Sequence, residues 1–141
     1  MLNERGDDAT TGAAKFATTY SGFTSGVTQV YVPYLLKYIA SAGYSWSTSI
    51  LIQNLDTSSD LTVDIYYNES PLIGTHSYTS TKTVSAFDFV DLRYDTNLGQ
   101  DTFYGGAKIV SRDNHPFGVV VLVRGSEGSG DALSSYLQIT Q

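Results

Sequence analysis

Short runs of alternating apolar and polar residues follow one another along most of this chain, separated by turn residues. The clearest run is Leu61–Tyr67, in which every second residue is apolar. Such alternation places one face of a strand in a core and the other face in water. Repeated at short intervals, it predicts an all-β domain of about seven or eight antiparallel strands, packed as a sandwich.

The boundaries of these strands follow from the turn residues between them. The predicted strands are Thr28–Tyr38, Ser45–Leu55, Leu61–Tyr67, His76–Val84, Phe87–Leu92, Phe103–Ser111, Phe117–Arg124 and Ala132–Gln141. Pro33 lacks a backbone donor, which places the first strand at a sheet edge or near a switch between sheets. Asp56–Asp60 is predicted as a hairpin loop, Arg93–Asp101 as a long loop and Gly125–Asp131 as a glycine-rich loop. The sixth and seventh strands are the most apolar and are expected to form a central pair.

Residues 1–26 differ from the rest and are predicted to be an N-terminal extension of a sandwich domain spanning residues 27–141. The extension is rich in Gly, Ala, Thr and Asp, as mobile termini are. Phe16, Tyr20 and Phe23 nevertheless supply apolar anchors, and Ala14–Thr24 is long enough to form a strand. A segment of this kind, with no pairing partner of its own, is suited to adding a strand to the sheet edge of a neighbouring subunit.

Composition narrows the classes of partner and chemistry. The net charge is −6, and this argues against nucleic acid, which requires a basic surface. There is no cysteine, so disulfides, a thiolate nucleophile and Cys-ligated metals are excluded. No apolar run is long enough for a membrane span, and the polar start is unlike a signal peptide. Two alternatives stay open: a leader already removed from a secreted protein, or a protein that never had one, such as a virion protein.

A resemblance to a known family rests on several short strings in a fixed order. They are Tyr31-Val32-Pro33, Trp46 followed by Ile50–Leu55, Val63–Tyr67, Gly105-Gly106-Ala107 with Val110-Ser111, His115-Pro116, and Gly130-Asp131-Ala132 before Tyr136. Together they resemble the immunoglobulin-like sandwich repeats of secreted and surface proteins of bacteria and archaea, over residues 30–138. Gly106 departs from the family, which often has Ser there. The resemblance implies a noncatalytic module of the cell surface, such as a stalk, adhesin or appendage, with no cofactor.

Candidate catalytic and metal-binding groups are sparse. His76 and His115 fall in different predicted hairpins, without a second histidine or a paired carboxylate at metal spacing. The Ser126 region superficially suggests a nucleophile elbow, but a strand rather than a helix is predicted after it. Calcium suits the oxygen-rich loops best, and the residues considered for it are Asp95, Asn97, Asp101, Glu127 and Asp131. These residues do not match a calcium-loop pattern, and local turn bonding explains them more simply. No enzyme activity, metal or cofactor is therefore expected.

Two further features bear on whether the protein works at the cell surface. Asn68-Glu69-Ser70 is an N-glycosylation sequon, predicted to lie in a surface loop, although Pro71 directly after it disfavours use. The chain also has 11 tyrosines, which could form a carbohydrate platform or a protein interface. Cross-strand pairing on a sheet face is the simpler role for about half of those considered. Because Tyr66 and Tyr67 are adjacent in a strand, at most one of them can be in the core.

These observations lead to one predicted function with two alternatives. The leading hypothesis is a non-enzymatic subunit of an extracellular, pilus-like filament, in which Phe16, Tyr20 and Phe23 dock into the next copy of the chain. One alternative is a virion structural protein, such as a capsid decoration or tail subunit. The other is an adhesin module that binds carbohydrate, with surface glycans or host cells as partners.

Overall fold

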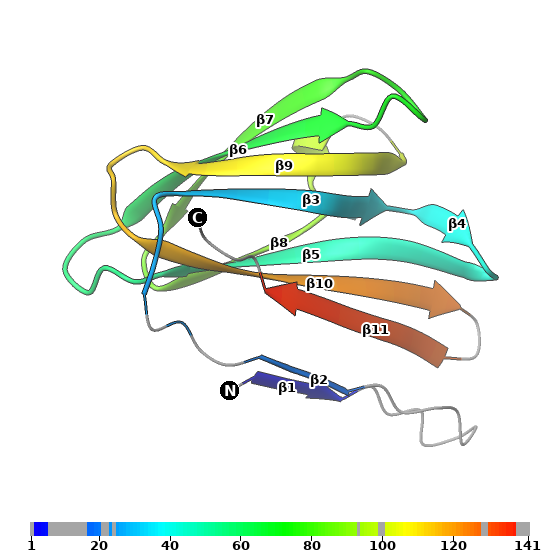
Figure 1. Cartoon of the computed structure of the whole chain (residues 1–141), viewed down its shortest axis with the longest axis horizontal. Coiled ribbons are helices and arrows are strands. Elements are labelled where there is room, and N and C mark those ends of the chain that lie inside the picture. The colour runs from blue at the N-terminus through cyan, green and yellow to red at the C-terminus, as the bar shows by residue number, and fades with distance from the viewer. Residues whose placement is uncertain are drawn as a thin grey trace.

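The computed structural model describes residues 2–5, 17–20, 23, 25–92, 94–98, 101–127 and 130–137. They form an all-β structure built from antiparallel sheets, as the sequence predicts (Figure 1). One sheet has four strands, in the order β3 (Gln29–Lys37), β9 (Phe103–Ser111), β6 (Leu61–Glu69) and β7 (Ser77–Val84). The other has five, with β11 (Gly130–Leu137), β10 (Phe117–Glu127) and β5 (Tyr44–Asn54) followed by β4 (Ile39–Ser41) and β8 (Phe87–Asp91), which both pair with β5.

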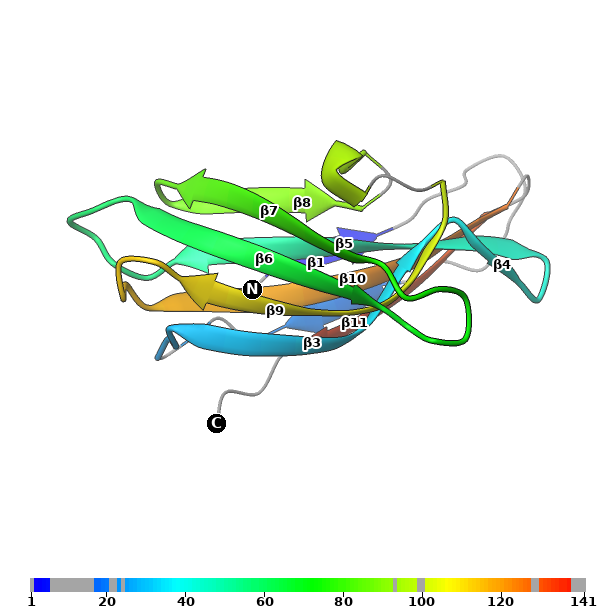
Figure 2. The ribbon, with the colours of Figure 1, turned by 90° about the horizontal axis from the view of Figure 1, so that it is seen from above.

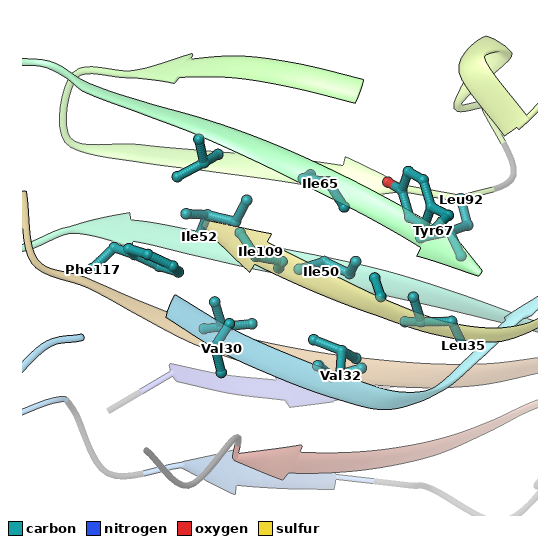
Figure 3. Packing of buried hydrophobic residues seen from close by; sticks show 14 of the residues in the cluster. Val30, Val32, Leu35, Ile50, Ile52, Ile65, Tyr67, Leu92, Ile109 and Phe117 are labelled. Carbon is teal, nitrogen blue, oxygen red and sulfur yellow. The ribbon is translucent and has the colours of Figure 1, made fainter. Parts of the chain in front are cut away.

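The core lies between these two sheets and collects the inward faces of both (Figure 3). Leu61, Val63, Ile65 and Tyr67 of β6 are all fully buried, which confirms the face predicted from their alternation. Ile50 and Ile52 of β5 meet them from the opposite sheet. Apolar burial is the main favourable term in folding, so these alternating strands account for the pairing of the two layers.

Several connections between strands cross from one sheet to the other, and here two predictions are wrong. The residues 56–60 do not close a hairpin, because β5 and β6 lie in opposite sheets (Figure 2). Strands β9 and β10 are likewise not paired with each other. Each has two neighbours within its own sheet and sends its apolar side chains into the shared core. Both strands are therefore central, but in different layers.

The first long strand changes sheets, as Pro33 indicates. β3 forms an edge of the four-stranded sheet, and its register with β9 shifts between Val32 and Leu35, around Pro33. The chain then passes through Tyr38, whose φ of 51° is unusual for a residue with a side chain, and continues as β4 in the other sheet. The backbone N–H of Tyr38 donates to the Ser47 hydroxyl at 3.2 Å, which holds the crossing point against β5.

Two turns were not predicted correctly. β4 and β5 form a tight hairpin through Ala42 and Gly43, with φ values of 53° and 84°, the positive values that a type I′ turn requires. The sequence gives no strong signal there because alanine occupies the first turn position. The predicted loop Gly125–Asp131 is wrong as well: β10 continues to Glu127 and β11 begins at Gly130, with the two residues paired.

The N-terminal segment contains a second, smaller hairpin. β1 (Leu2–Arg5) pairs antiparallel with β2 (Ala17–Tyr20) in a two-stranded sheet of its own. The strand predicted within the extension thus has a partner in its own chain, contrary to the expectation that it has none. β2 lies beside β11 at the edge of the five-stranded sheet (Figure 1).

Candidate functional site

The outward face of the five-stranded sheet carries an apolar cluster of Leu51, Val120 and Leu122, which we call the outer cluster. Leu51 comes from β5, and the other two residues alternate on β10 with the core residues Val119 and Val121. Although they point away from the core, all three are buried, at 4%, 1% and 1% exposure. Apolar residues on an outward sheet face require a cover, and Phe23 of the N-terminal segment packs against them.

The ring of Phe23 fits onto β10 because residue 118 is glycine. Gly118 lies on the same outward face, between the inward-facing Phe117 and Val119. A Cβ atom placed on Gly118 would collide with the ring of Phe23. Because Gly118 has no side chain, there is space on this face of β10 for the aromatic ring of Phe23.

The segment that carries Phe23 is fixed to the sandwich four residues later. Val27 and Phe117 exchange two backbone hydrogen bonds, of 3.0 and 2.9 Å. Gly26, next to this bridge, is enclosed, since a Cβ there would lie 2.7 Å from Leu55 and 2.9 Å from Pro116. The predicted anchor Phe23 is thus placed on the chain's own sheet. Phe16 lies outside the described residues, and Tyr20 is described as the last residue of β2.

A second feature is an apolar groove of about 580 Å³ at the place where the chain crosses between sheets. Its lining comes from both sheets and the loops at this end: Tyr34, Leu36, Ile39, Ser41, Ala42, Trp46, Ile73, Tyr104 and Val123. Tyr34 and Tyr104 meet edge to face, with ring centroids 5.9 Å apart. Trp46 is placed by Gly125, where a Cβ would lie 3.1 Å from the indole ring.

The groove offers aromatic faces and few polar groups. The indole N–H of Trp46 donates to the Ser41 carbonyl at 3.0 Å, so this donor is already used within the chain. Exposed aromatic faces in a concave, mostly apolar site are common in small-ligand and sugar sites. Of the tyrosines considered from sequence, Tyr34 and Tyr104 belong to this groove. Tyr67 is in the core, whereas its neighbour Tyr66 is 41% exposed, as their adjacency requires.

Comparison with known proteins shows a similarity at the level of the fold. No family model matches the sequence. No curated protein matches it either. A crystal structure described as Thermotoga maritima 1070 is similar, with a TM-score of 0.63 and 11% sequence identity, over 82% of this chain and 96% of that one. At this identity the likeness concerns the fold alone.

The loop that was considered for calcium instead joins the core through hydrogen bonds. Asp95 is buried, and its carboxylate accepts the Tyr67 hydroxyl at 2.9 Å and the backbone and side-chain N–H groups of Asn97 at 3.0 Å each. Burial, together with the charge of Asp95, raises the pKa of the Tyr67 hydroxyl. Asp101 is exposed. Among the described residues, no three acidic or histidine side chains gather as a metal site.

The two histidines make different contacts. His76 donates from Nδ1 to the buried carboxylate of Glu69 at 2.7 Å, and this hydrogen bond lowers the pKa of Glu69. His115 contacts the Asp60 carbonyl at 3.1 Å from its own Nδ1. The described part of the chain contains no helix long and apolar enough to cross a membrane.

Asn68 lies at the end of β6 rather than in a loop, because the strand continues to Glu69. Its side chain is exposed, and its Oδ1 accepts a hydrogen bond from Ser77 Oγ at 3.1 Å. The strand position corrects the predicted loop, while sugar attachment stays a prediction.

On the outward face of the four-stranded sheet, Asp64 is held by a cation and a hydroxyl. Arg112 Nε lies 2.6 Å from one carboxylate oxygen, and Thr81 donates to the other at 2.6 Å. Hydrogen bonding from Arg112 is the main cause that lowers the pKa of Asp64 below its usual 3.8. A lowered folded-state pKa means that this group stabilises the fold above the unfolded-state pKa.

We therefore expect part of the acid sensitivity of the protein to come from Asp64. Its contribution declines as the pH falls from about 5 through the folded-state pKa. Urea unfolding measured between pH 7 and pH 2 should show a smaller loss of stability with acid in Asp64→Asn than in the parent chain. Equal slopes in the two proteins would contradict this assignment.

Proposed function

We propose that this protein is a non-enzymatic structural subunit of an extracellular filament, joined to its neighbours through the N-terminal segment. The observation that carries the proposal is the docking of Phe23 on the outer cluster. In this contact, the aromatic ring of the N-terminal segment fits the outer cluster, a surface that every copy of the chain possesses. A head-to-tail contact between copies builds an open filament when its rotation does not close into a ring.

The strand pairings bear on the immunoglobulin-like assignment, which is part of the same proposal. Taking β3 as the first strand, β5 and β8 pair as the second and fifth strands of that fold do, and β6 and β9 as its third and sixth. These pairings support the assignment. Two other placements depart from it. β9 and β10 lie in different sheets, whereas their counterparts share one sheet. β3 and β7 lie in the sheet of β6 and β9, whereas the first and fourth strands of that fold share the sheet of its second and fifth.

Electron microscopy tests the filament directly. The parent chain is compared with a variant lacking residues 1–26 and with one lacking residues 1–22, which keeps Phe23. We expect polymers from the parent chain and none from the longer deletion. Polymers of equal length in all three samples, or monomers in the parent sample over a wide range of concentration, would refute the proposal.

The groove favours a second candidate, a carbohydrate-binding adhesin. Aromatic rings such as Tyr34, Trp46 and Tyr104 present flat apolar faces, against which the C–H face of a sugar can stack. This candidate requires a soluble glycan to enter a groove that lies apart from the outer cluster.

Trp46 is the one tryptophan of the chain and reports on this candidate. If the adhesin hypothesis holds, an oligosaccharide selected on a glycan array should change its fluorescence, and Tyr104→Ala should weaken binding by roughly tenfold. Tyr31→Ala is the matched control, because Tyr31 is exposed on β3 but does not line the groove. Absence of binding to every glycan would dismiss the adhesin.

A further inference from the structure

The loop between β6 and β7 projects two aliphatic side chains at its tip, Leu72 and Ile73. Leu72 is 82% exposed, more than any other large apolar residue in the described part of the chain, and Ile73 is 48% exposed. A singly exposed apolar residue needs no explanation, but this pair adjoins the apolar groove, which Ile73 helps to line. The tip and the groove together form one apolar surface that this chain leaves uncovered.

The tip is braced by hydrogen bonds within its own loop. The backbone N–H groups of Ile73 and Gly74 both donate to the Ser70 carbonyl, at 3.0 and 3.1 Å. Behind them, the buried carboxylate of Glu69 accepts the ring Nδ1 and the backbone N–H of His76, at 2.7 and 3.2 Å. A Cβ atom on Gly74 would collide with this carboxylate, so the loop packs closely over it. A projection that is already held in place loses little conformational entropy when it binds.

The groove beside the tip is suited to an apolar group. The described residues that line it include no charged side chain. The indole N–H of Trp46 already donates to the Ser41 carbonyl, and the backbone N–H of Leu36 donates to the Thr48 hydroxyl at 2.8 Å. An aliphatic side chain can enter such a site without needing a hydrogen-bonding partner there.

The tip and the groove lie at the end of the sandwich opposite to the bridge between Val27 and Phe117. Gly125, which packs against Trp46, is eight residues along β10 from Phe117, or about 26 Å. The β6–β7 loop and β4 are seen at this same end in Figures 1 and 2. This surface is therefore separate from the place where the N-terminal segment joins the core.

A projection and a groove on one surface make that surface complementary to itself. If a two-fold axis passes between them, the tip of each copy faces the groove of the other copy, and the same contact forms twice. An interface of this kind closes with two copies. Each copy has a net charge of −6, which opposes association, whereas the contact itself is uncharged. Added salt should therefore strengthen the pair.

We propose that the occupant of the groove is a second copy of this chain, with Leu72 of each copy inserted into the groove of the other. The partner copy thus supplies the apolar group that the groove accommodates. This inference goes beyond the proposed function and does not depend on it, because the contact uses the other end of the sandwich and closes as a pair with or without a filament.

Trp46 reports on this contact directly, since it is the one tryptophan of the chain and lines the groove. In a dilution series of the full chain, its emission should shift to shorter wavelength as the concentration rises through the midpoint of pairing. Leu72→Asp should raise this midpoint at least about thirtyfold, and Leu72→Ala, which adds no charge, roughly tenfold. Leu72→Met should raise it far less, because its volume is similar. Well below the midpoint the chain is monomeric, and there Leu72→Ala leaves its stability nearly unchanged.

Cross-linking shows which surfaces meet. The chain has no cysteine, so with one introduced cysteine per copy every cross-link joins two copies. Leu72→Cys should react through a short bismaleimide with Ser41→Cys, because Ser41 is exposed and lines the groove. Ser58→Cys is the matched control, since Ser58 is exposed in the loop that follows β5 at the opposite end, and it should give no product with Leu72→Cys.

Three results would each refute the pair while leaving the filament to be judged by microscopy. The first is Trp46 emission that does not depend on protein concentration, including emission that responds only to an added glycan. The second is a midpoint in Leu72→Asp equal to that of the parent. The third is cross-linking of Leu72→Cys to Ser58→Cys in place of Ser41→Cys, which would mean that the tip meets another surface.

Discussion

Replacing Phe117 with alanine is expected to lower the free energy of unfolding by about 3–5 kcal/mol. Phe117 is fully buried on the inward face of β10, among the core residues that join the two sheets (Figure 3). Truncation removes a large apolar surface and leaves a cavity that the neighbouring strands can fill only in part. Its backbone bridge to Val27 also makes it the point where the N-terminal segment joins the core.

Urea denaturation at neutral pH measures this effect. Phe117→Leu should cost clearly less, because most of the buried volume is kept. Leu72→Ala is the exposed control: Leu72 is 82% exposed, and its loss should change stability by no more than about 0.5 kcal/mol. A change below about 1 kcal/mol for Phe117→Ala would mean that the core collapses around the missing ring.

Replacing Asp95 with alanine should lower the free energy of unfolding by about 1–3 kcal/mol. The buried Tyr67 hydroxyl would lose its acceptor, and the N–H groups of Asn97 would lose theirs. A buried donor without a partner is costly because it has given up its hydrogen bonds to water. The turn Thr96–Leu98, which follows Asp95, should also become less protected from hydrogen exchange.

Asp95→Asn is the matched variant, since an amide oxygen can still accept a hydrogen bond. It should lose less stability than Asp95→Ala in urea denaturation. Tyr67→Phe combined with Asp95→Ala should be less destabilising than the sum of the single changes, because both remove the same bond. Strict additivity would show that the Tyr67–Asp95 contact does not contribute to stability.

The sequence predicted the strands well because alternation reports directly on burial. All eight predicted strands occur, and the position of Pro33 correctly indicated an edge strand near a sheet switch. The partners of the strands were predicted less well. Strands β5 and β6 carry the same pattern whether they pair or face one another, so periodicity alone could not reveal that residues 56–60 cross between sheets.

The candidate site was only partly accessible from sequence. Phe23 could be recognised as an anchor, but Gly118 could not be recognised as its seat, because a glycine in a strand signals a close approach without naming the partner. Leu51 and Val120 looked like ordinary strand residues, and only the alternation of β10 against the core shows that they face outward. The groove likewise joins residues from β3, β5, β9 and β10, whose proximity depends on the tertiary fold.

The crossings between sheets also have a kinetic consequence. The chain changes layers between β3 and β4, between β5 and β6, between β7 and β8, between β8 and β9, and again between β9 and β10. Neither sheet is formed by one continuous stretch of the sequence. A fragment that contains all the strands of one sheet therefore also contains strands of the other. The fold depends on pairing between strands that are distant in the sequence, and domains of this type fold on a timescale of about milliseconds to seconds. During synthesis, the edge of β5 that pairs with β10 would stay without this partner until β10 is made, more than sixty residues later.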